Sequence, residues 1–272
     1  MRIHQFTMPT MLTIAGMLTA WITAENAPAI TGLEVMKERE RRHERPFEES
    51  WVVMNLYGKD GTPKKPRLMV TYSREVSGLD QRLLKFSEPA DIRNVGLLTW
   101  EQPDEKEDDQ WLYLPASRQV KRIAGGGKKN LFMGTDLAYE DLRPENLAAY
   151  DYEITGETEI DGAKCWVVTA TPKTGKEKAD TGYAKKVYSI RQDIYFTVRT
   201  EFYNRRGKLS KVGTFERLVK VAEQTWRCNL ATVERPDEGT KTVIIHKSRT
   251  LDKELPASLF TQQGLRRPVE SK

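Results

Sequence analysis

The 272-residue chain is predicted to be mainly β, with a strongly curved antiparallel sheet that forms an incomplete, half β-barrel. Three observations predict this fold. Runs rich in Val, Ile, Tyr, Thr and Trp recur roughly every ten residues from about position 49. Short turns that contain glycine separate many of these runs. Long helices do not alternate with them, which excludes a doubly wound α/β sheet.

The N-terminus has the pattern of a secretory signal peptide. An apolar run without charges extends from Met11 to Ala24, and Glu25 follows it. This run is shorter than the about 20 residues that a membrane span needs, and Ala24 suits cleavage. We therefore expect a signal peptide over 1–24 and a single domain over 25–272. An uncleaved anchor is the alternative interpretation.

After the signal, residues 30–50 read "ITGLEVMKERERRHERPFEES" and predict a charged helix that Pro46 ends. Leu33 and Met36 recur at helical spacing on one side. The strand-like runs begin directly afterwards. In the first half they are "SWVVMNLYG", "PRLMVTYSR", "QRLLKFSEP", "VGLLTWEQ", "QWLYLPAS" and "RQVKRIAG". In the second half they include "YDYEITGETEI", "KCWVVTATP", "AKKVYSIRQ", "YFTVRTEFY", "KLSKVGTFERLV", "WRCNLATVER" and "TKTVIIHKSRT".

The turns predict how the strands pair. "KDGT" at 59–62, "IDGA" at 160–163 and "NRRGK" at 204–208 are hairpin connections, so their neighbours are antiparallel. About a dozen strands exceed what an open sheet holds flat, so we expect strong curling. Apolar and charged residues alternate along many strands, so one face is predicted to be wet and the other covered. The N-terminal helix and the irregular stretch 124–150 are the covers available, and they are small enough to leave a hydrophobic cavity.

Composition and motifs argue against nucleic-acid binding and catalysis. The formal charge is +5, and 44 basic and 39 acidic residues are interspersed, whereas nucleic-acid binders gather basic residues on one face. The expected mature chain keeps His43 and His246, and it contains none of the common nucleophile, zinc or phosphate-loop motifs. We therefore predict no enzyme, no catalytic residues, no cofactor, no metal site and no nucleic-acid partner.

The segment "FMGTDLAYEDL" at 132–142 mixes apolar and acidic residues. Asp136 and Glu140 are one helical turn apart and, with Asp141, could form an acid pair or a cation site. Asp136 is also suited to capping a short helix, and we favour this interpretation. The preceding "GGGKK" at 125–129 is interpreted as a hinge. The segment is therefore predicted to be a short helical flap over the cavity.

Two sets of site residues follow. The apolar set is predicted to line the cavity and flap and to bind acyl chains, with filling of an ordinary core as the alternative. It comprises Trp51, Met54, Leu84, Phe86, Leu98, Trp100, Phe132, Met133, Leu137 and Tyr139. The second set is a basic rim suited to lipid headgroups or an acidic partner, with solvated charge as the alternative. It comprises Lys121, Arg122, Lys128 and Lys129. Cys165 and Cys228 form either one disulfide or two free thiols.

Four stretches resemble the LolA-like outer membrane lipoprotein-sorting protein family. They are "WLYLPASRQVKRI", "FMGTDLAYEDL", "FSEPADIRNVGLLTW" and "TKTVIIHKSRTLDKELPASLFTQQGL". The resemblance extends from about residue 34 to 265. It implies a protein of the Gram-negative periplasm with an incomplete barrel, roofed by helices, whose cavity holds acyl chains. It also implies an association of some members with RND-type exporters.

The predicted function is a periplasmic carrier that shields lipid or lipoprotein acyl chains during transfer towards the outer membrane. The alternative is an accessory interaction module of an RND-type inner-membrane exporter, which would dock through the charged helix 34–45 or the basic rim and carry no lipid. A hydrolase that uses Asp136, Glu140 or Asp141 is a third hypothesis.

Overall fold

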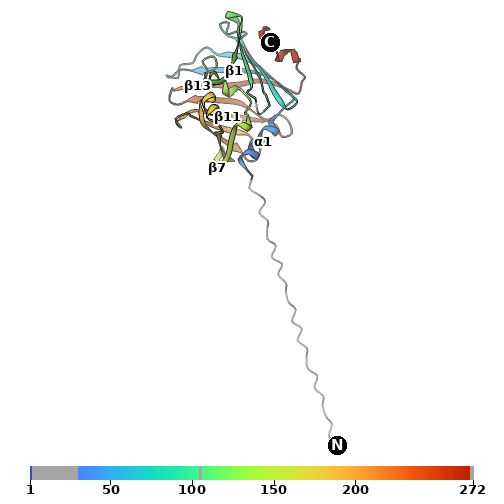
Figure 1. Cartoon of the computed structure of the whole chain (residues 1–272). Helices are drawn as coiled ribbons and strands as arrows, with labels where there is room; N and C mark the ends of the chain where they lie inside the picture. The colour runs from blue at the N-terminus through green and yellow to red at the C-terminus, as the bar shows by residue number, and fades with distance from the viewer. Residues whose placement is uncertain (2–29, 104–105, 270–272) are drawn as a thin grey trace.

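The computed structural model describes residues 1, 30–103 and 106–269, and its main element is one curled sheet (Figure 1). The first six strands are β1 (Phe47–Tyr57), β2 (Arg67–Val76), β3 (Leu79–Glu88), β4 (Gly96–Trp100), β5 (Asp109–Leu114) and β6 (Gln119–Ile123). The other seven are β7 (Tyr150–Ile160), β8 (Ala163–Pro172), β9 (Tyr183–Arg191), β10 (Thr197–Asn204), β11 (Leu209–Lys220), β12 (Trp226–Arg235) and β13 (Thr240–Leu251).

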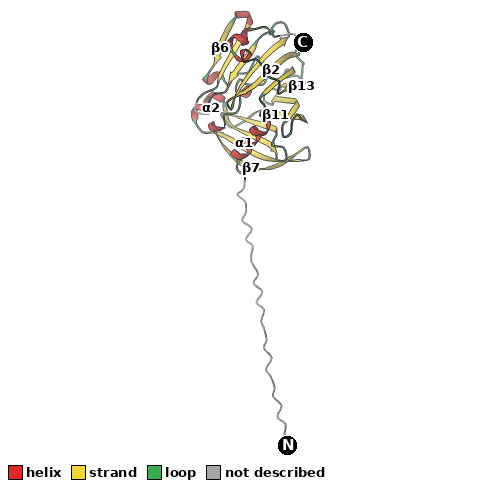
Figure 2. Ribbon diagram, turned by 90° about the vertical axis from the view of Figure 1, so that its right-hand side faces the viewer, coloured by secondary structure: helices red, strands yellow, loops and turns green. Residues whose placement is uncertain are grey.

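The strand order explains the shape of the sheet. All neighbours are antiparallel, and the order is β6-β5-β4-β3-β2-β1-β13-β12-β11-β10-β9-β8-β7. The first and last strands therefore pair in the middle, and β6 and β7 form the two edges, at opposite ends of the molecule in Figure 2. The edges do not pair, so the sheet is an open half-barrel. This confirms the predicted fold class, and the three predicted hairpin turns join β1 to β2, β7 to β8 and β10 to β11.

The chain must pass from one edge of the sheet to the other between β6 and β7, and this connection crosses the concave face. It contains the short 3-10 helices η2 (Gly125–Gly127), η3 (Glu140–Leu142) and η4 (Leu147–Ala149), with η1 (Pro115–Ser117) before it. We call residues 128–143 the covering segment. The prediction that 124–150 covers the sheet is correct, because a connection between two distant edges has to cross one of the faces.

Helix α1 (Gly32–His43) covers the other part of the concave face. Thr31 and Glu34 form a capping box at its start, and the helix ends before Pro46. Gly32 lies so close to β7 that an added Cβ would be 2.7 Å from the carbonyl oxygen of Tyr152. The helix buries Val35 and Met36 against β7, β8 and β9, whereas Leu33 is exposed. Leu33 and Met36 were predicted to share one side of the helix, but only Met36 is buried.

The convex face is not entirely wet, which corrects the sequence prediction. After β13 the chain forms η5 (Ala257–Phe260) and α3 (Gln262–Arg266), and α2 (Gly175–Thr181) lies elsewhere, between β8 and β9. Leu255, Phe260 and Leu265 are buried against Leu83 and Leu98 on the outer side of β3 and β4. We call residues 255–267 the C-terminal cover. Apolar residues on both faces of β3 and β4 make this two-sided packing favourable.

The predicted signal peptide over 1–24 lies outside the described residues, apart from Met1, and the domain boundary at 25 also lies outside them. Within the described part, none of the helices has the length and apolar character to cross a membrane.

Candidate functional site

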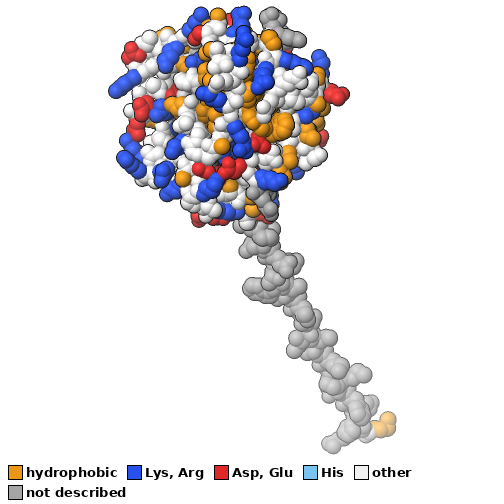
Figure 3. Space-filling view, turned by 45° about the horizontal axis from the view of Figure 1, so that its top comes forward, with side chains coloured by type: hydrophobic (Ala, Val, Ile, Leu, Met, Phe, Trp, Pro, Cys, Tyr) orange, Lys and Arg blue, Asp and Glu red, His pale blue; other side chains and the backbone are white. Residues whose placement is uncertain are grey.

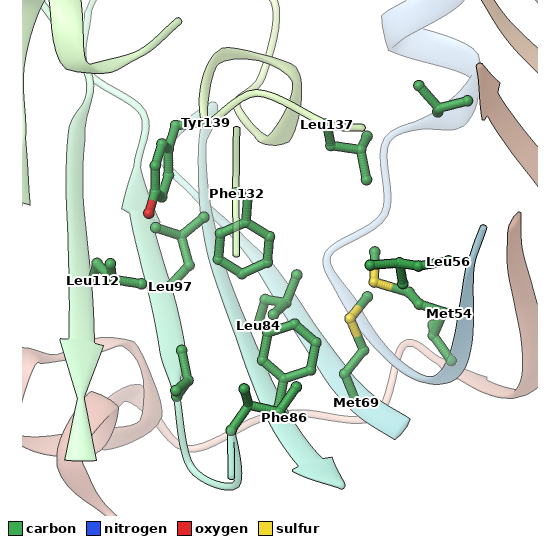
Figure 4. Packing of buried hydrophobic residues seen from close by; sticks show 14 residues of the cluster. Met54, Leu56, Met69, Leu84, Phe86, Leu97, Leu112, Phe132, Leu137 and Tyr139 are labelled. Carbon is green, nitrogen blue, oxygen red and sulfur yellow. The ribbon is translucent and has the colours of Figure 1, made fainter. Parts of the chain in front are cut away.

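The concave face under the covering segment is the candidate site. Figure 4 shows Phe132, Leu137 and Tyr139 pointing down from this segment onto the strands. The ring of Phe132 stacks on Phe86 with centroids 5.6 Å apart and meets Tyr139 edge to face at 5.6 Å. Side chains of β1 to β5 complete this apolar cluster, among them Met54, Leu56, Met69, Leu84, Leu97 and Leu112. The covering segment thus fills the apolar part of the concave face with its own side chains.

The structure brings seven of the ten predicted acyl-binding residues together in this cluster. They are Met54, Leu84, Phe86, Phe132, Met133, Leu137 and Tyr139. Their role in binding lipid stays a prediction.

Three predicted residues lie elsewhere. Leu98 and Trp100 pack on the convex face against the C-terminal cover, and Trp100 donates its indole N–H to the carbonyl of Phe260 at 2.8 Å. The period of two explains this error: Leu97 pairs with Leu84 across β3 and β4, so Leu98 faces outward. Trp51 is buried but belongs to neither of these clusters.

Asp136 fastens the covering segment to β13 and does not cap a helix. Its carboxylate accepts hydrogen bonds from Thr240 and Thr242 at 2.5 and 2.8 Å, and its backbone N–H donates to the Thr242 hydroxyl at 3.0 Å. The only helical turn of the segment is η3, which begins at Glu140. The prediction that Asp136 caps a helix was wrong, because hydroxyls of a strand distant in sequence satisfy it.

Asp141 fastens the same segment to the other half of the sheet. It pairs with the buried Lys211 of β11 and accepts a hydrogen bond from the Tyr183 hydroxyl of β9 at 2.8 Å. Burial lowers the pKa of Lys211 and, together with Asp141, raises the pKa of Tyr183 well above its usual value. Tyr183 therefore stays protonated and acts as a donor.

A buried ionic cluster holds the end of the covering segment. Arg143 lies 3.0 Å from Glu140 and 3.2 Å from Asp108 of the loop before β5, and each of these side chains is at most 4% exposed. Burial raises the pKa of Glu140 and of Asp108, although Arg143 opposes both shifts. Lys186 of β9 lies 4.0 Å from Glu140. Asp136 and Asp141 are thus matched by hydroxyls and a cation of the sheet, and Glu140 by Arg143 of the segment itself and by Lys186 of the sheet. Sequence reasoning missed these partners.

A serine of β1 and a histidine of β13 form a pair of the kind that nucleophilic catalysis uses. The Ser50 hydroxyl lies 2.8 Å from Nδ1 of His246. Burial and Arg249 lower the pKa of His246 to about 4, so the ring is neutral at pH 7. No carboxylate in the described residues hydrogen-bonds to His246, and those residues hold no cluster of three or more metal-binding side chains. The absence of catalysis stays a prediction.

The predicted basic rim is not continuous. Lys121 and Arg122 lie on the edge strand β6, where Arg122 pairs with Asp109 at 2.6 Å. Lys128 is 2% exposed and pairs with Glu107 at 3.6 Å, so its placement on an exposed rim was wrong. Lys129 is exposed. Figure 3 shows Lys and Arg side chains spread over the face of the molecule that it presents. Cys165 and Cys228 are free thiols.

Comparison with known structures defines the class of protein. A domain from Vibrio parahaemolyticus described as an outer membrane lipoprotein-sorting protein is 30% identical, with a TM-score of 0.80 over 87% of this chain and 98% of its own. A LolA superfamily protein from Nitrosomonas europaea shares the fold at 19% identity, with a TM-score of 0.67 over 87% of this chain and all of its own. The fold is therefore that of the LolA-like lipoprotein-sorting proteins.

The particular family is also shown. A DUF1329 family protein from Desulfovibrio piger is 30% identical, with a TM-score of 0.79 over 86% of this chain and 97% of its own. A family model described as "Uncharacterized protein" matches residues 78–267. The chain belongs to this DUF1329 family of LolA-like proteins. A search of curated proteins found no match.

Proposed function

We propose that the protein is a periplasmic carrier that binds acyl chains of lipids or lipoproteins on its concave face and passes them towards the outer membrane. The observation that carries this proposal is the apolar patch of Met, Leu and Phe side chains on β1 to β5, covered by a single chain segment. A signal peptide over 1–24 would export the protein. The family relationship to lipoprotein-sorting domains supports the same function.

Binding requires that the covering segment leaves the sheet. Each buried methylene of an acyl chain contributes about 0.8 kcal/mol, so a chain of ordinary length can replace the contacts of Phe132, Leu137 and Tyr139. The polar bonds of Asp136 and Asp141 must also open, and water can satisfy these groups once they are exposed. Methionine is suited to such a surface because its flexible side chain adapts to different ligands.

A disulfide that locks the segment tests this proposal. Asp136→Cys and Thr242→Cys place two thiols where the native side chains already touch, and Cys165→Ser and Cys228→Ser remove competing thiols. We expect the oxidised form to lose binding of a fluorescent acyl probe and the reduced form of the same protein to recover it. Mass spectrometry verifies the bond. Equal probe binding in both forms would place the ligand elsewhere.

The filled concave face favours a second candidate function, an accessory interaction module of an RND-type inner-membrane exporter. In this case the covering segment is a permanent part of the core, and the charged helix α1 supplies the docking surface. Lipid mass spectrometry of gently purified protein separates the candidates. Bound lipid supports the carrier, whereas capture of a transporter by lipid-free protein that binds no acyl probe supports the module.

A further inference from the structure

Two adjoining pockets lie at the seam between the covering segment and strands β9 to β11. Both are lined by Lys129 and Tyr183. The larger pocket has a volume of about 370 Å³, and its remaining lining residues are Thr181, Gly182, Asn204, Arg205 and Arg206. The smaller has a volume of about 180 Å³, and its remaining lining residues are Leu131, Asp136, Ala138, Ser210, Lys211 and Arg235. A shared wall makes these pockets one candidate site with two compartments.

The larger pocket is the cationic compartment. Three positive side chains line it, Lys129, Arg205 and Arg206, and no carboxylate does. Nearby cations are already paired, Lys208 with Asp237 and Arg235 with Glu238. In the described part of the chain, no carboxylate pairs with Lys129, Arg205 or Arg206. Their charges are therefore available to a ligand.

Local structure holds these cations in place. Arg205 and Arg206 lie at the tip of the β10–β11 hairpin, where the Asn204 side chain accepts hydrogen bonds from the backbone N–H groups of Arg206 and Lys208 at 2.9 and 3.2 Å. On the opposite wall, the stem of Lys129 lies against Gly182. A Cβ added at Gly182, whose φ is +82°, would be 3.1 Å from the Cβ of Lys129. The hydrogen bonds of Asn204 thus hold Arg205 and Arg206 on one side of the pocket, and the close contact with Gly182 holds Lys129 on the other.

We propose that the larger pocket binds a phosphate group. The planar guanidinium groups of two neighbouring arginines can each offer paired N–H donors to phosphate oxygens, and a lysine adds a third charge. The volume suits a small phosphate ester. The smaller pocket, lined in part by Leu131, Ala138 and Ser210, would contact the uncharged part of such a ligand. The phosphate can come from a free anion or from a lipid headgroup, and this site does not depend on acyl-chain binding.

Calorimetric titration of the full chain tests the site with two probes, inorganic phosphate and monomeric dihexanoyl phosphatidylglycerol. The variant Lys129→Gln/Arg205→Gln/Arg206→Gln removes the three cations. The matched control is Lys64→Gln/Lys65→Gln/Lys253→Gln, which removes three other exposed charges. We expect the first variant to lower the affinity for at least one probe about tenfold and the control to leave it unchanged, because charge-assisted hydrogen bonds are local.

The two probes distinguish the sources, because binding of inorganic phosphate identifies a free anion and binding of the lipid alone identifies a headgroup. Asn204→Ala is a second variant that keeps every charge and loosens the hairpin tip, and we expect a smaller loss. Equal losses in the triple variant and its control, or no loss in either, would overturn the proposal. The fluorescent acyl probe should bind the triple variant normally, so failure of this site is separable from failure of the carrier function.

Discussion

Two segments cover the same strands from opposite faces, and they are fastened in different ways. The C-terminal cover buries Leu255, Phe260 and Leu265 on the convex face, and its backbone carbonyls accept hydrogen bonds from Trp100 and Lys85 of the sheet. The covering segment on the concave face also buries apolar side chains, but Asp136 and Asp141 tie it to hydroxyls and a lysine of distant strands. Apolar burial is favourable wherever the segment rests, whereas buried ion pairs hold one particular geometry and are lost together when it opens.

This contrast suggests different roles. The C-terminal cover completes the fold, because its apolar side chains pack as in an ordinary core and its polar contacts involve backbone carbonyls and not ion pairs. The covering segment occupies the surface on which a ligand would bind, and its polar anchors can be exchanged for water. The following predictions test whether the two segments differ in this way.

The largest effects are expected from truncating one phenylalanine in each segment. Phe132 and Phe260 are both 0% exposed, so Phe132→Ala and Phe260→Ala should each lower the free energy of unfolding by about 3–5 kcal/mol. Only Phe132→Ala should raise the affinity for the acyl probe, because it vacates the concave face. Chemical denaturation and probe titration measure both quantities. A similar rise in Phe260→Ala would remove the distinction between the segments.

Removing the central cation of the ionic cluster should have a comparable effect. Arg143→Met leaves Glu140 and Asp108 buried without this partner, and we expect a loss of about 3–5 kcal/mol in unfolding free energy. Arg41→Met is the matched control. Arg41 binds Glu38 at 2.7 Å, but its side chain is 63% exposed, so the loss there should stay below about 1 kcal/mol. Losses of equal size would show that the cluster does not act as a buried anchor.

The two covers should respond to pH with opposite signs. Burial raises the pKa of Glu140 above 4.5, so the folded state binds more protons than the unfolded state and stability falls as pH rises from 4.5 through the raised pKa. Lys85 contacts backbone carbonyls of the C-terminal cover, and burial lowers its pKa to about 8. Between pH 8 and 10.5 Lys85 therefore binds fewer protons in the folded state than in the unfolded state, so the free energy of unfolding rises as pH rises through this range.

Each group can contribute a slope of up to about 1.4 kcal/mol per pH unit. Denaturation curves across pH 4–11 compare the wild type with Glu140→Gln and Lys85→Met. Glu140→Gln should remove the fall at acidic pH, and Lys85→Met should remove the alkaline rise. Profiles that are unchanged by both substitutions would contradict this assignment.

The smallest effect concerns the predicted basic rim. Arg122 is exposed on the edge strand and pairs only with Asp109 among the described residues, so Arg122→Gln should change the unfolding free energy by less than about 1 kcal/mol. Thermal unfolding measures this change. A loss of several kcal/mol would mean that the edge strand depends on this pair.

The comparison also shows which sequence signals were reliable. Glycine turns such as Asp161–Gly162, in which both residues have positive φ, predicted hairpins because the conformation is local to the turn. The alternation of Leu84 and Lys85 correctly predicted opposite faces, since a strand has a period of two. The same rule puts the adjacent Leu97 and Leu98 on opposite faces, so only one of them can belong to the concave cluster.

The burial of Lys128 and the packing of the C-terminal cover could not be predicted from neighbouring residues in the sequence. Lys128 and Lys129 are adjacent and identical in type, yet one is buried against Glu107 and the other is exposed beside the β10–β11 hairpin. The C-terminal cover was missed because its apolar residues are few and widely spaced. Nothing near these residues in the sequence indicates which distant surface they meet.

The sequence by itself determined the antiparallel strands, their turns, the N-terminal helix and the family, because these depend on short-range patterns and on motifs of neighbouring residues. Only the tertiary structure decided the partners of the acids that first suggested an active site. Asp136 meets Thr242 and Asp141 meets Lys211, across separations of 106 and 70 residues. Such pairs form where a curled sheet brings remote strands under one segment, and burial then makes each charge depend on its partner.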